Sequence, residues 1–248
     1  MAREMPEGAR NAADEPGVRA DLRLLTGAEC AAIREDVLAL REHWTAWIPG
    51  VPFFTVGAAS YKDAATAGFD AYREKARALN PILRARFGWL HERLRAALAL
   101  ELGREFFYDP LLALPGFHVF GYHEAFTRPG AAAHVDLQFK DLDWSRWENV
   151  DPEDQLSITL AVRLPAQGGG LQLWPVTYAE IREMKAEELK RILETEPAFH
   201  AYREGRLVVH SGYRLHQIAP AADMRPEDER ITLQAHAISV RGGYVLYW

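Results

Sequence analysis

Residues 205–220 read Gly205-Arg-Leu-Val-Val-His-Ser-Gly-Tyr-Arg-Leu-His-Gln-Ile-Ala-Pro220, two short apolar runs separated by the turn Ser211-Gly212. Short apolar runs bounded by glycine and proline are typical of β-strands. The same pattern recurs from residue 110 onward, which predicts a sandwich or barrel of many short strands. The other predicted strands are Phe117 to Tyr122, Ala133 to Phe139, Leu156 to Leu164, Leu171 to Trp174 and Ile231 to Val240. Gly242-Gly243 predicts a short terminal hairpin ending at Trp248.

The chain before residue 110 has helical signals instead. Thr26 followed by Glu29 matches a capping box, and the apolar spacing after it predicts a helix near 27–43. Asn80-Pro81 is typical of an N-cap and first helical position, so we predict a long helix from there to about residue 102. A shorter helix is expected near 68–79, and another interrupts the strands near 177–194.

These patterns predict a mainly β protein with a helical N-terminal part. Residues 1–20 have no apolar period and are expected to form a flexible tail. We expect one domain over residues 21–248, with a mainly helical support over 21–109. Its β core over 110–248 would contain the helical insertion.

The composition excludes several classes of function. The chain has 248 residues, a net charge of −6 and no dense run of Lys or Arg, so nucleic acid is not an expected partner. Its one cysteine, Cys30, excludes an internal disulfide framework and a thiolate zinc site. No apolar stretch is long enough to span a membrane, and no signal-peptide core is evident. We therefore expect a soluble cytoplasmic protein.

His134-Val135-Asp136 is a candidate metal site. Side chains at i and i+2 of a strand share a face, so His134 and Asp136 could bind one ion, with His216 completing the site from a distant strand. Two imidazoles and one carboxylate form the facial set of non-haem Fe(II) oxygenases, which leaves positions open for a co-substrate and O2. His-x-Asp alone is weak, because histidine more often packs or caps than binds metal.

Several histidines compete for the distal position. We favour His216 over His210, since it leads directly into the strand and loop before Arg230. His118, His123 and His236 are further alternatives, but none of them has a carboxylate two residues later.

Arg230 is a candidate anion clamp, because a guanidinium presents a fixed fork of donors to a carboxylate. Thr232, two residues later, is expected on the same strand face and could donate to the same carboxylate. The alternative for Arg230 is an edge salt bridge with Glu227 or Asp228.

At these residues the chain resembles the Fe(II)/2-oxoglutarate-dependent dioxygenase superfamily. The resemblance covers about residues 110–240 and little of the helical part. The matching pieces are His134-Val-Asp136, Gly168-Gly-Gly-Leu-Gln-Leu-Trp174, Gly205 to Gly212, His216-Gln-Ile-Ala-Pro220 and Arg230-Ile-Thr232. One departure is His210, where many relatives have an apolar residue.

The resemblance implies a double-stranded β-helix (jelly-roll) core flanked by α-helices. It also implies that His134, Asp136 and His216 bind Fe(II), and that Arg230 and Thr232 bind 2-oxoglutarate. The implied reaction couples decarboxylation of 2-oxoglutarate to succinate and CO2 with oxidation of a substrate by O2. Halogenating relatives typically have a small residue in place of Asp136, so the resemblance favours hydroxylation, or a related desaturation or ring closure.

The substrate side is less determined. Candidate contacts are His118, Tyr122, Arg128, Phe139 and Trp174. The tryptophans of the segment Gln138 to Trp147 could wall a pocket or simply pack on helices. The expected substrate is a small molecule, such as an amino acid or a natural-product intermediate. The alternatives are a peptidyl or protein hydroxylase of the same superfamily and a non-catalytic metal-binding jelly-roll protein. The oligomeric state is left open.

Overall fold

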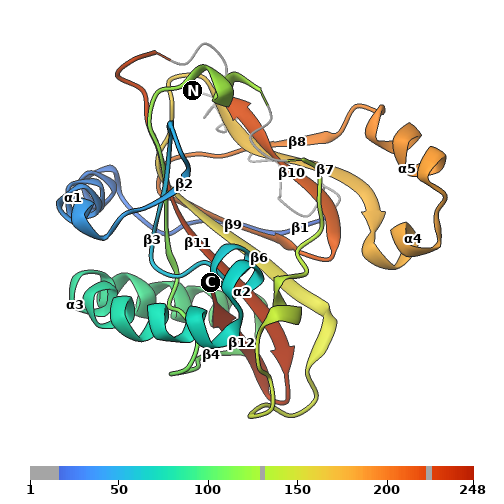
Figure 1. Ribbon diagram of the computed structural model, residues 1–248, viewed down its shortest axis with the longest axis horizontal. Helices are drawn as coiled ribbons and strands as arrows, with labels where there is room; N and C mark the ends of the chain where they lie inside the picture. Colours follow the sequence, from blue (N-terminus) through green and yellow to red (C-terminus); the bar gives the residue numbers. More distant parts are fainter. Residues whose placement is uncertain (1–16, 129–131, 222–224) are drawn as a thin grey trace, which may run out of the picture.

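The computed structural model describes residues 17–128, 132–221 and 225–248. Two sheets, one antiparallel and one antiparallel except for a single pair of strands, form the centre of the described fold (Figure 1). The large sheet has the order β1-β9-β6-β11-β5-β3-β2, with β12 paired to β11 and β4 paired in parallel to β12. The small sheet has the order β10-β7-β8.

The large sheet consists of β1 Val18–Arg23, β2 Thr45–Ile48, β3 Val51–Val56, β4 Glu105–Tyr108, β5 Gly116–Phe120, β6 Asp151–Arg163, β9 Arg206–Ser211, β11 Arg230–Val240 and β12 Gly243–Tyr247. The small sheet consists of β7 Gly168–Thr177, β8 Ala198–Ala201 and β10 Arg214–Ala221. The α-helices are α1 Gly27–Ala39, α2 Ser60–Ala67, α3 Phe69–Leu102, α4 Tyr178–Glu183 and α5 Ala186–Leu193, and the 3-10 helices are η2 Arg41–His43, η3 Glu124–Thr127 and η4 Gln138–Asp141. Two sheets with flanking helices confirm the predicted jelly-roll core.

The main apolar core lies between the large sheet and the helices α1 and α3 (Figure 1). The predicted stripe on α3 supplies Leu83, Phe87, Leu90, Leu94 and Leu98, each at most 1% exposed. Burying a leucine or phenylalanine side chain is worth about 1.5–3 kcal/mol, so this face fixes the helix against the sheet. The cavity described below is not part of this core.

Thr26 begins α1 as predicted. Its backbone N–H donates to the Glu29 carboxylate at 2.8 Å, and the Glu29 N–H donates to the Thr26 hydroxyl at 3.2 Å. This reciprocal pair is a capping box.

The prediction of a helix start at Asn80-Pro81 was wrong, because α3 is continuous from Phe69 to Leu102. The proline removes one hydrogen bond within the helix, but it lies on the exposed face, where water can satisfy the freed carbonyl. Asn80 does not cap. Its side-chain amide donates to Leu112 O at 2.9 Å and its carbonyl accepts from Leu114 N at 3.0 Å.

Three further expectations need correction. The predicted tail over 1–20 is shorter than expected, because β1 begins at Val18 and pairs with β9; residues 1–16 lie outside the described residues. The predicted strand over Ala133 to Phe139 is an isolated bridge at His134 followed by η4. The predicted helix near 177–194 is two short helices, α4 and α5, which project beyond the small sheet (Figure 1).

The part predicted as mainly helical also contains β2, β3 and β4. β3 pairs with β5 and carries Phe53, while β2 carries Trp47, and both side chains line the cavity of the site. Within the described residues, no helix is both long enough and apolar enough to cross a membrane.

Candidate metal centre

Three side chains converge at one point between the two sheets. The ligand atoms of His134, Asp136 and His216 all lie within 4.8 Å of one another. His134 Nε2 is 3.7 Å from Asp136 Oδ1, and His216 Nε2 is 3.4 Å from Asp136 Oδ2. Asp136 and His216 are buried, whereas the His134 side chain is 41% exposed, so the group opens on one side.

The backbone positions this group although residues 134–136 are not a full strand. His134 and His216 form an antiparallel bridge, and the Asp136 N–H donates to Gly212 O at 2.8 Å. The Gln155 amide donates to Asp136 O at 2.6 Å. Gly212 must be small, because a Cβ there would lie 2.7 Å from Ser157 Oγ.

The imidazole tautomers suit metal binding. His134 Nδ1 is 2.8 Å from Ala132 O, and His216 Nδ1 is 2.8 Å from Arg214 O. A carbonyl only accepts hydrogen bonds, so both Nδ1 atoms donate and both Nε2 atoms keep a lone pair. The donor set of two neutral Nε2 atoms and one carboxylate therefore fits a ferrous ion.

The electrostatics keep the group in its ligating form. Burial raises the pKa of Asp136, but attraction to His216, His236 and His134 in their protonated forms and a hydrogen bond from Ser157 outweigh it and hold that pKa well below its usual range, so that Asp136 is a carboxylate before the imidazoles lose their protons. Burial lowers the pKa of His216. A deprotonated carboxylate beside neutral imidazoles is the state that binds a metal.

The two distal candidates differ in their relation to the carboxylate. His216 Nε2 contacts Asp136, while His210 meets the His216 ring edge to face, with ring centroids 4.6 Å apart, and lies outside the converging group. Burial lowers the pKa of His210 to about 3, so it lines the cavity as a neutral ring. The geometry therefore brings His216, not His210, to the candidate ligand pair.

Two further residues lie beside the carboxylate. The Ser157 hydroxyl donates to Asp136 Oδ2 from β6, and His236 Nδ1 lies 3.7 Å from the same oxygen on β11. Sequence reasoning missed Ser157, since a serine within an apolar run has no distinctive spacing, and it considered His236 only as an alternative distal ligand. The strand register that pairs Ser157 with His236 places both next to the metal candidate.

Arg230 lies in the same cavity. It is 7% exposed, and its guanidinium carbon lies 5.7 Å from the Phe120 ring and 5.5 Å from the Tyr202 ring. Its Nε is buried without a hydrogen-bond partner among the described residues. A buried cation is costly unless an anion accompanies it, so this environment is suited to a carboxylate ligand.

The predicted partner of Arg230 is placed differently. Thr232 is fully buried, its hydroxyl accepts a hydrogen bond from the Gln234 amide at 2.9 Å, and it does not line the cavity. Gln234 lines the cavity instead, so any contribution of Thr232 to a ligand would act through Gln234.

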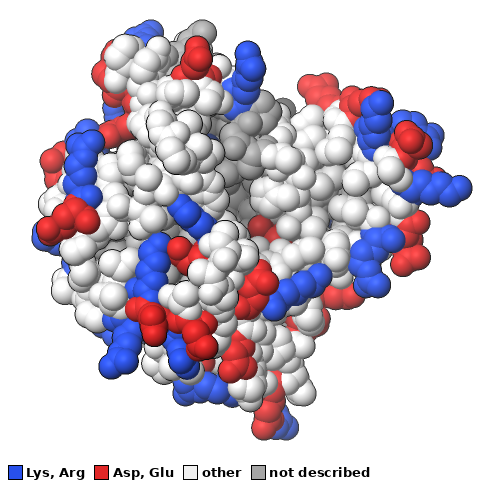
Figure 2. All heavy atoms as spheres, in the orientation of Figure 1, with Lys and Arg blue, Asp and Glu red and all other residues white. Residues whose placement is uncertain are grey.

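One cavity of about 670 Å³ joins the metal candidate to Arg230. Pockets for small molecules typically have about 300–1,000 Å³, so the space accommodates a co-substrate and part of a second molecule. Figure 2 shows the molecule hollowed between its two halves, with many of the charged side chains around the outer margins.

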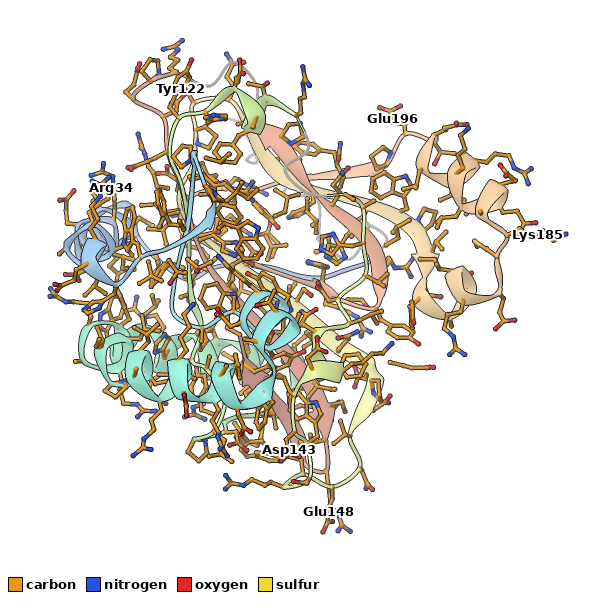
Figure 3. All side chains as sticks on the ribbon, in the orientation of Figure 1. Arg34, Tyr122, Asp143, Glu148, Lys185 and Glu196 are labelled. Atoms are coloured by element: carbon orange, nitrogen blue, oxygen red, sulfur yellow. The ribbon has the colours of Figure 1, made fainter. Side chains whose placement is uncertain are left out.

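Of the predicted substrate residues, the structure brings only His118 to this cavity. Tyr122 is 48% exposed and lies at the outer edge of the molecule (Figure 3). Arg128 borders a separate small hollow, which Phe120 and Arg230 also line. Phe139 belongs to the apolar cluster around α2 and Tyr247, and Trp174 packs against the inserted helices. Their physical environment is packing or solvent.

The two tryptophans after Phe139 also pack outside the cavity. Trp144 donates to Phe139 O at 2.7 Å, and Trp147 donates to Asp109 at 2.7 Å. Of the two interpretations of these tryptophans, packing against other parts of the fold agrees with the structure, and walling of the pocket does not.

No protein-family model matches the sequence, and no curated protein sequence does. Solved structures do match. An N-substituted L-amino acid dioxygenase from Burkholderia ambifaria AMMD, in complex with α-ketoglutarate, matches with a TM-score of 0.57 and 17% identity over 96% of this chain and 88% of that one. The α-ketoglutarate-dependent non-haem epimerase SnoN from nogalamycin biosynthesis matches with a TM-score of 0.52 and 17% identity, over 94% and 85% of the two chains. Such identities establish a shared fold.

Proposed function

We propose that this chain, which has the fold of Fe(II)/2-oxoglutarate-dependent dioxygenases, is itself such an oxygenase and hydroxylates a small molecule. One observation carries the proposal: the His134, Asp136 and His216 group and the buried guanidinium of Arg230 line the same cavity. A metal scaffold without turnover has no evident need for an anion clamp in the cavity of its metal.

In this proposal the Nε2 atoms of His134 and His216 and the carboxylate of Asp136 hold Fe(II). Arg230 binds the far carboxylate of 2-oxoglutarate, and Gln234, whose amide donates to the Thr232 hydroxyl, lies beside it in the cavity. The iron would supply activation of O2, which couples decarboxylation of the co-substrate to substrate oxidation.

Hydroxylation is the proposed outcome because Asp136 keeps the carboxylate that halogenating relatives lack. The cavity volume lies in the usual range of small-molecule pockets, which supports a small-molecule substrate. Epimerisation or ring closure of such a substrate would use the same residues, and product analysis separates these reactions.

The test is ligand spectroscopy followed by turnover. Under anaerobic conditions Fe(II) and 2-oxoglutarate should give a charge-transfer absorption band, and aerobic protein should then release succinate, slowly even without substrate. Arg230→Met should weaken the 2-oxoglutarate dependence of the band. The matched control is Arg163→Met, since Arg163 is on the neighbouring strand and pairs with Glu204 away from the cavity. Absence of the band and of succinate would favour the non-catalytic alternative.

A further inference from the structure

The cavity has an aromatic wall beside the metal candidate. Its members are Trp47 on β2, Phe53 on β3, Tyr61 on α2, and His118 and Phe120 on β5. The Tyr61 ring centroid is 6.0 Å from that of His236, whose Nδ1 is 3.7 Å from the Asp136 carboxylate. The His236 ring thus lies between Tyr61 of the wall and Asp136 of the metal candidate.

The rings of the wall cover one another's faces. Phe53 stacks on Phe120 at 4.1 Å and on Trp47 at 4.9 Å, and the Lys62 ammonium lies 4.8 Å from the Trp47 centroid. A cation would need an open ring face, and the faces of Phe53 and Trp47 are occupied by Phe120, by each other and by Lys62. The edge of an aromatic ring carries the positive end of its quadrupole and complements the face of another ring, in the T-shaped arrangement.

The charged groups of the cavity also favour an uncharged ligand. Among the described lining residues, those with a formal charge are Asp136, Lys140, Asp141 and Arg230. The metal and the co-substrate use Asp136 and Arg230, and Lys140 and Asp141 are exposed at the margin. Burial lowers the pKa of His118 to about 3, so this ring is neutral. A substrate charge carried to the metal would therefore be buried without a partner, which is costly.

We propose that the part of the substrate that reaches the metal is an uncharged planar ring, aromatic or conjugated, held against the wall of Trp47, Phe53 and Tyr61. This inference rests on the proposed function for the identity of the centre, and it disfavours a free amino acid, whose carboxylate and ammonium would both need partners. The Tyr61 hydroxyl, which is hydrogen bonded to His118, is the polar group beside this ring.

The test compares 2-naphthol with 2-naphthoate, decahydro-2-naphthol and L-leucine as probes of anaerobic protein loaded with Fe(II) and 2-oxoglutarate. Affinity is measured by calorimetry and by perturbation of the charge-transfer band. The neutral aromatic probe should bind at least about tenfold more tightly than the other three. Tighter binding of the carboxylate, the saturated alcohol or the amino acid, or no binding of any probe, would overturn the proposal while the band itself still supports the iron site.

Two variants locate the binding. Trp47→Leu should weaken 2-naphthol binding about tenfold without changing the band, while Trp89→Leu, at a 44% exposed tryptophan on α3, should not. Equal affinity in Trp47→Leu would overturn the assignment. Ala65→Arg, at an exposed position of α2 that lines the cavity, should shift preference toward 2-naphthoate. If Trp47→Leu does not fold, Ala65→Arg tests where the probe binds. An unchanged preference between 2-naphthol and 2-naphthoate in this variant counts against the proposal.

If the band never forms, the oxygenase proposal fails, and calorimetry on metal-free protein still decides the ring proposal. The wall is built from β2, β3, β5 and α2, so its binding of 2-naphthol does not require the metal. Binding of the neutral ring to metal-free protein would support the wall on its own, and absence of binding there would overturn it.

Discussion

His134 and His216 donate their backbone N–H groups to each other's carbonyl oxygens, both at 2.8 Å. This pair of hydrogen bonds joins the irregular segment before η4 to the edge of the small sheet. Directly paired residues of antiparallel chains project their side chains to the same face, and the two ring centroids lie 4.5 Å apart. The bridge thus fixes both imidazoles before any metal binds.

Replacement of His216 by alanine should abolish stoichiometric Fe(II) binding, because one of three ligands is lost. Isothermal titration with Fe(II) under anaerobic conditions measures this. His210→Ala is the matched control, since the His210 ring also lines the cavity and contacts the His216 ring edge to face but lies outside the converging group. The reverse result would reassign the distal ligand to His210.

Ser157→Ala should weaken Fe(II) binding about 10–100-fold, the usual cost of removing a hydrogen bond to a metal ligand. The serine hydroxyl orients the Asp136 carboxylate, so its loss should leave the stoichiometry at one ion while the affinity falls. Ser157→Thr keeps a hydroxyl and should recover part of the affinity. Unchanged affinity in the alanine variant would show that the carboxylate is held by its backbone contacts alone.

The strands β5, β6, β7, β9, β10 and β11 could be predicted because each contains a short apolar run bounded by glycine or proline, whereas β1, β2, β3, β4 and β8 were not predicted. The segment that carries His134 and Asp136 could not be predicted correctly. It has the same pattern of a short apolar run, yet it forms a single bridge with β10 and then continues into η4. The metal group nevertheless assembles, because one bridge and the Asp136–Gly212 hydrogen bond suffice to orient the two side chains.

The aromatic wall could not be predicted from the sequence, for a different reason. Trp47 and Phe53 are on β2 and β3, two short strands inside a stretch whose strongest signal is helical. β2 pairs with β3, and β3 pairs with β5; this last pairing is a long-range contact, about which local propensity has no information. The substrate candidates selected by proximity to the motif, such as Phe139, instead pack in a separate cluster.

Arg230→Met should raise the melting temperature of the protein measured without co-substrate, or leave it unchanged. The guanidinium is buried beside Phe120 and Tyr202, and an apolar side chain of similar length removes the cost of burying a charge. Saturating 2-oxoglutarate and metal should raise the melting temperature of the wild type much more than that of the variant. Differential scanning fluorimetry with and without 2-oxoglutarate makes the comparison, and equal stabilisation of both proteins would return Arg230 to a structural role.

Asn80→Ala should destabilise the fold by about 1–3 kcal/mol, because the buried amide satisfies two backbone groups of the segment before β5. Chemical denaturation gives the free energy of unfolding. Pro81→Ala is the informative neighbour, since the proline lies on the exposed face of a continuous helix and its replacement should stabilise the protein. A destabilised Pro81→Ala would show that the proline has a role in the bend or entry of the helix.

Stability should fall between about pH 6.5 and pH 4 partly through His91, which lies in the core far from the metal candidate. Burial lowers its pKa to about 4, although its Nε2–H donates to Pro115 O at 3.0 Å. The unfolded chain has the ordinary pKa of about 6.5 and binds the proton first, so His91 contributes fully to stability above pH 6.5 and progressively less below it.

At about pH 5 this linkage amounts to about 2 kcal/mol. His91→Gln keeps a donor for Pro115 and removes the titration, so denaturation at about pH 7.5 and pH 5 should show a smaller loss of unfolding free energy in the variant than in the wild type. His118 and His210 contribute in the same direction in both proteins and cancel in the comparison. Parallel curves for the two proteins would mean that the pKa of His91 does not differ between the folded and unfolded chain, which the burial of the ring and of its Nδ1, unpartnered among the described residues, makes unfavourable.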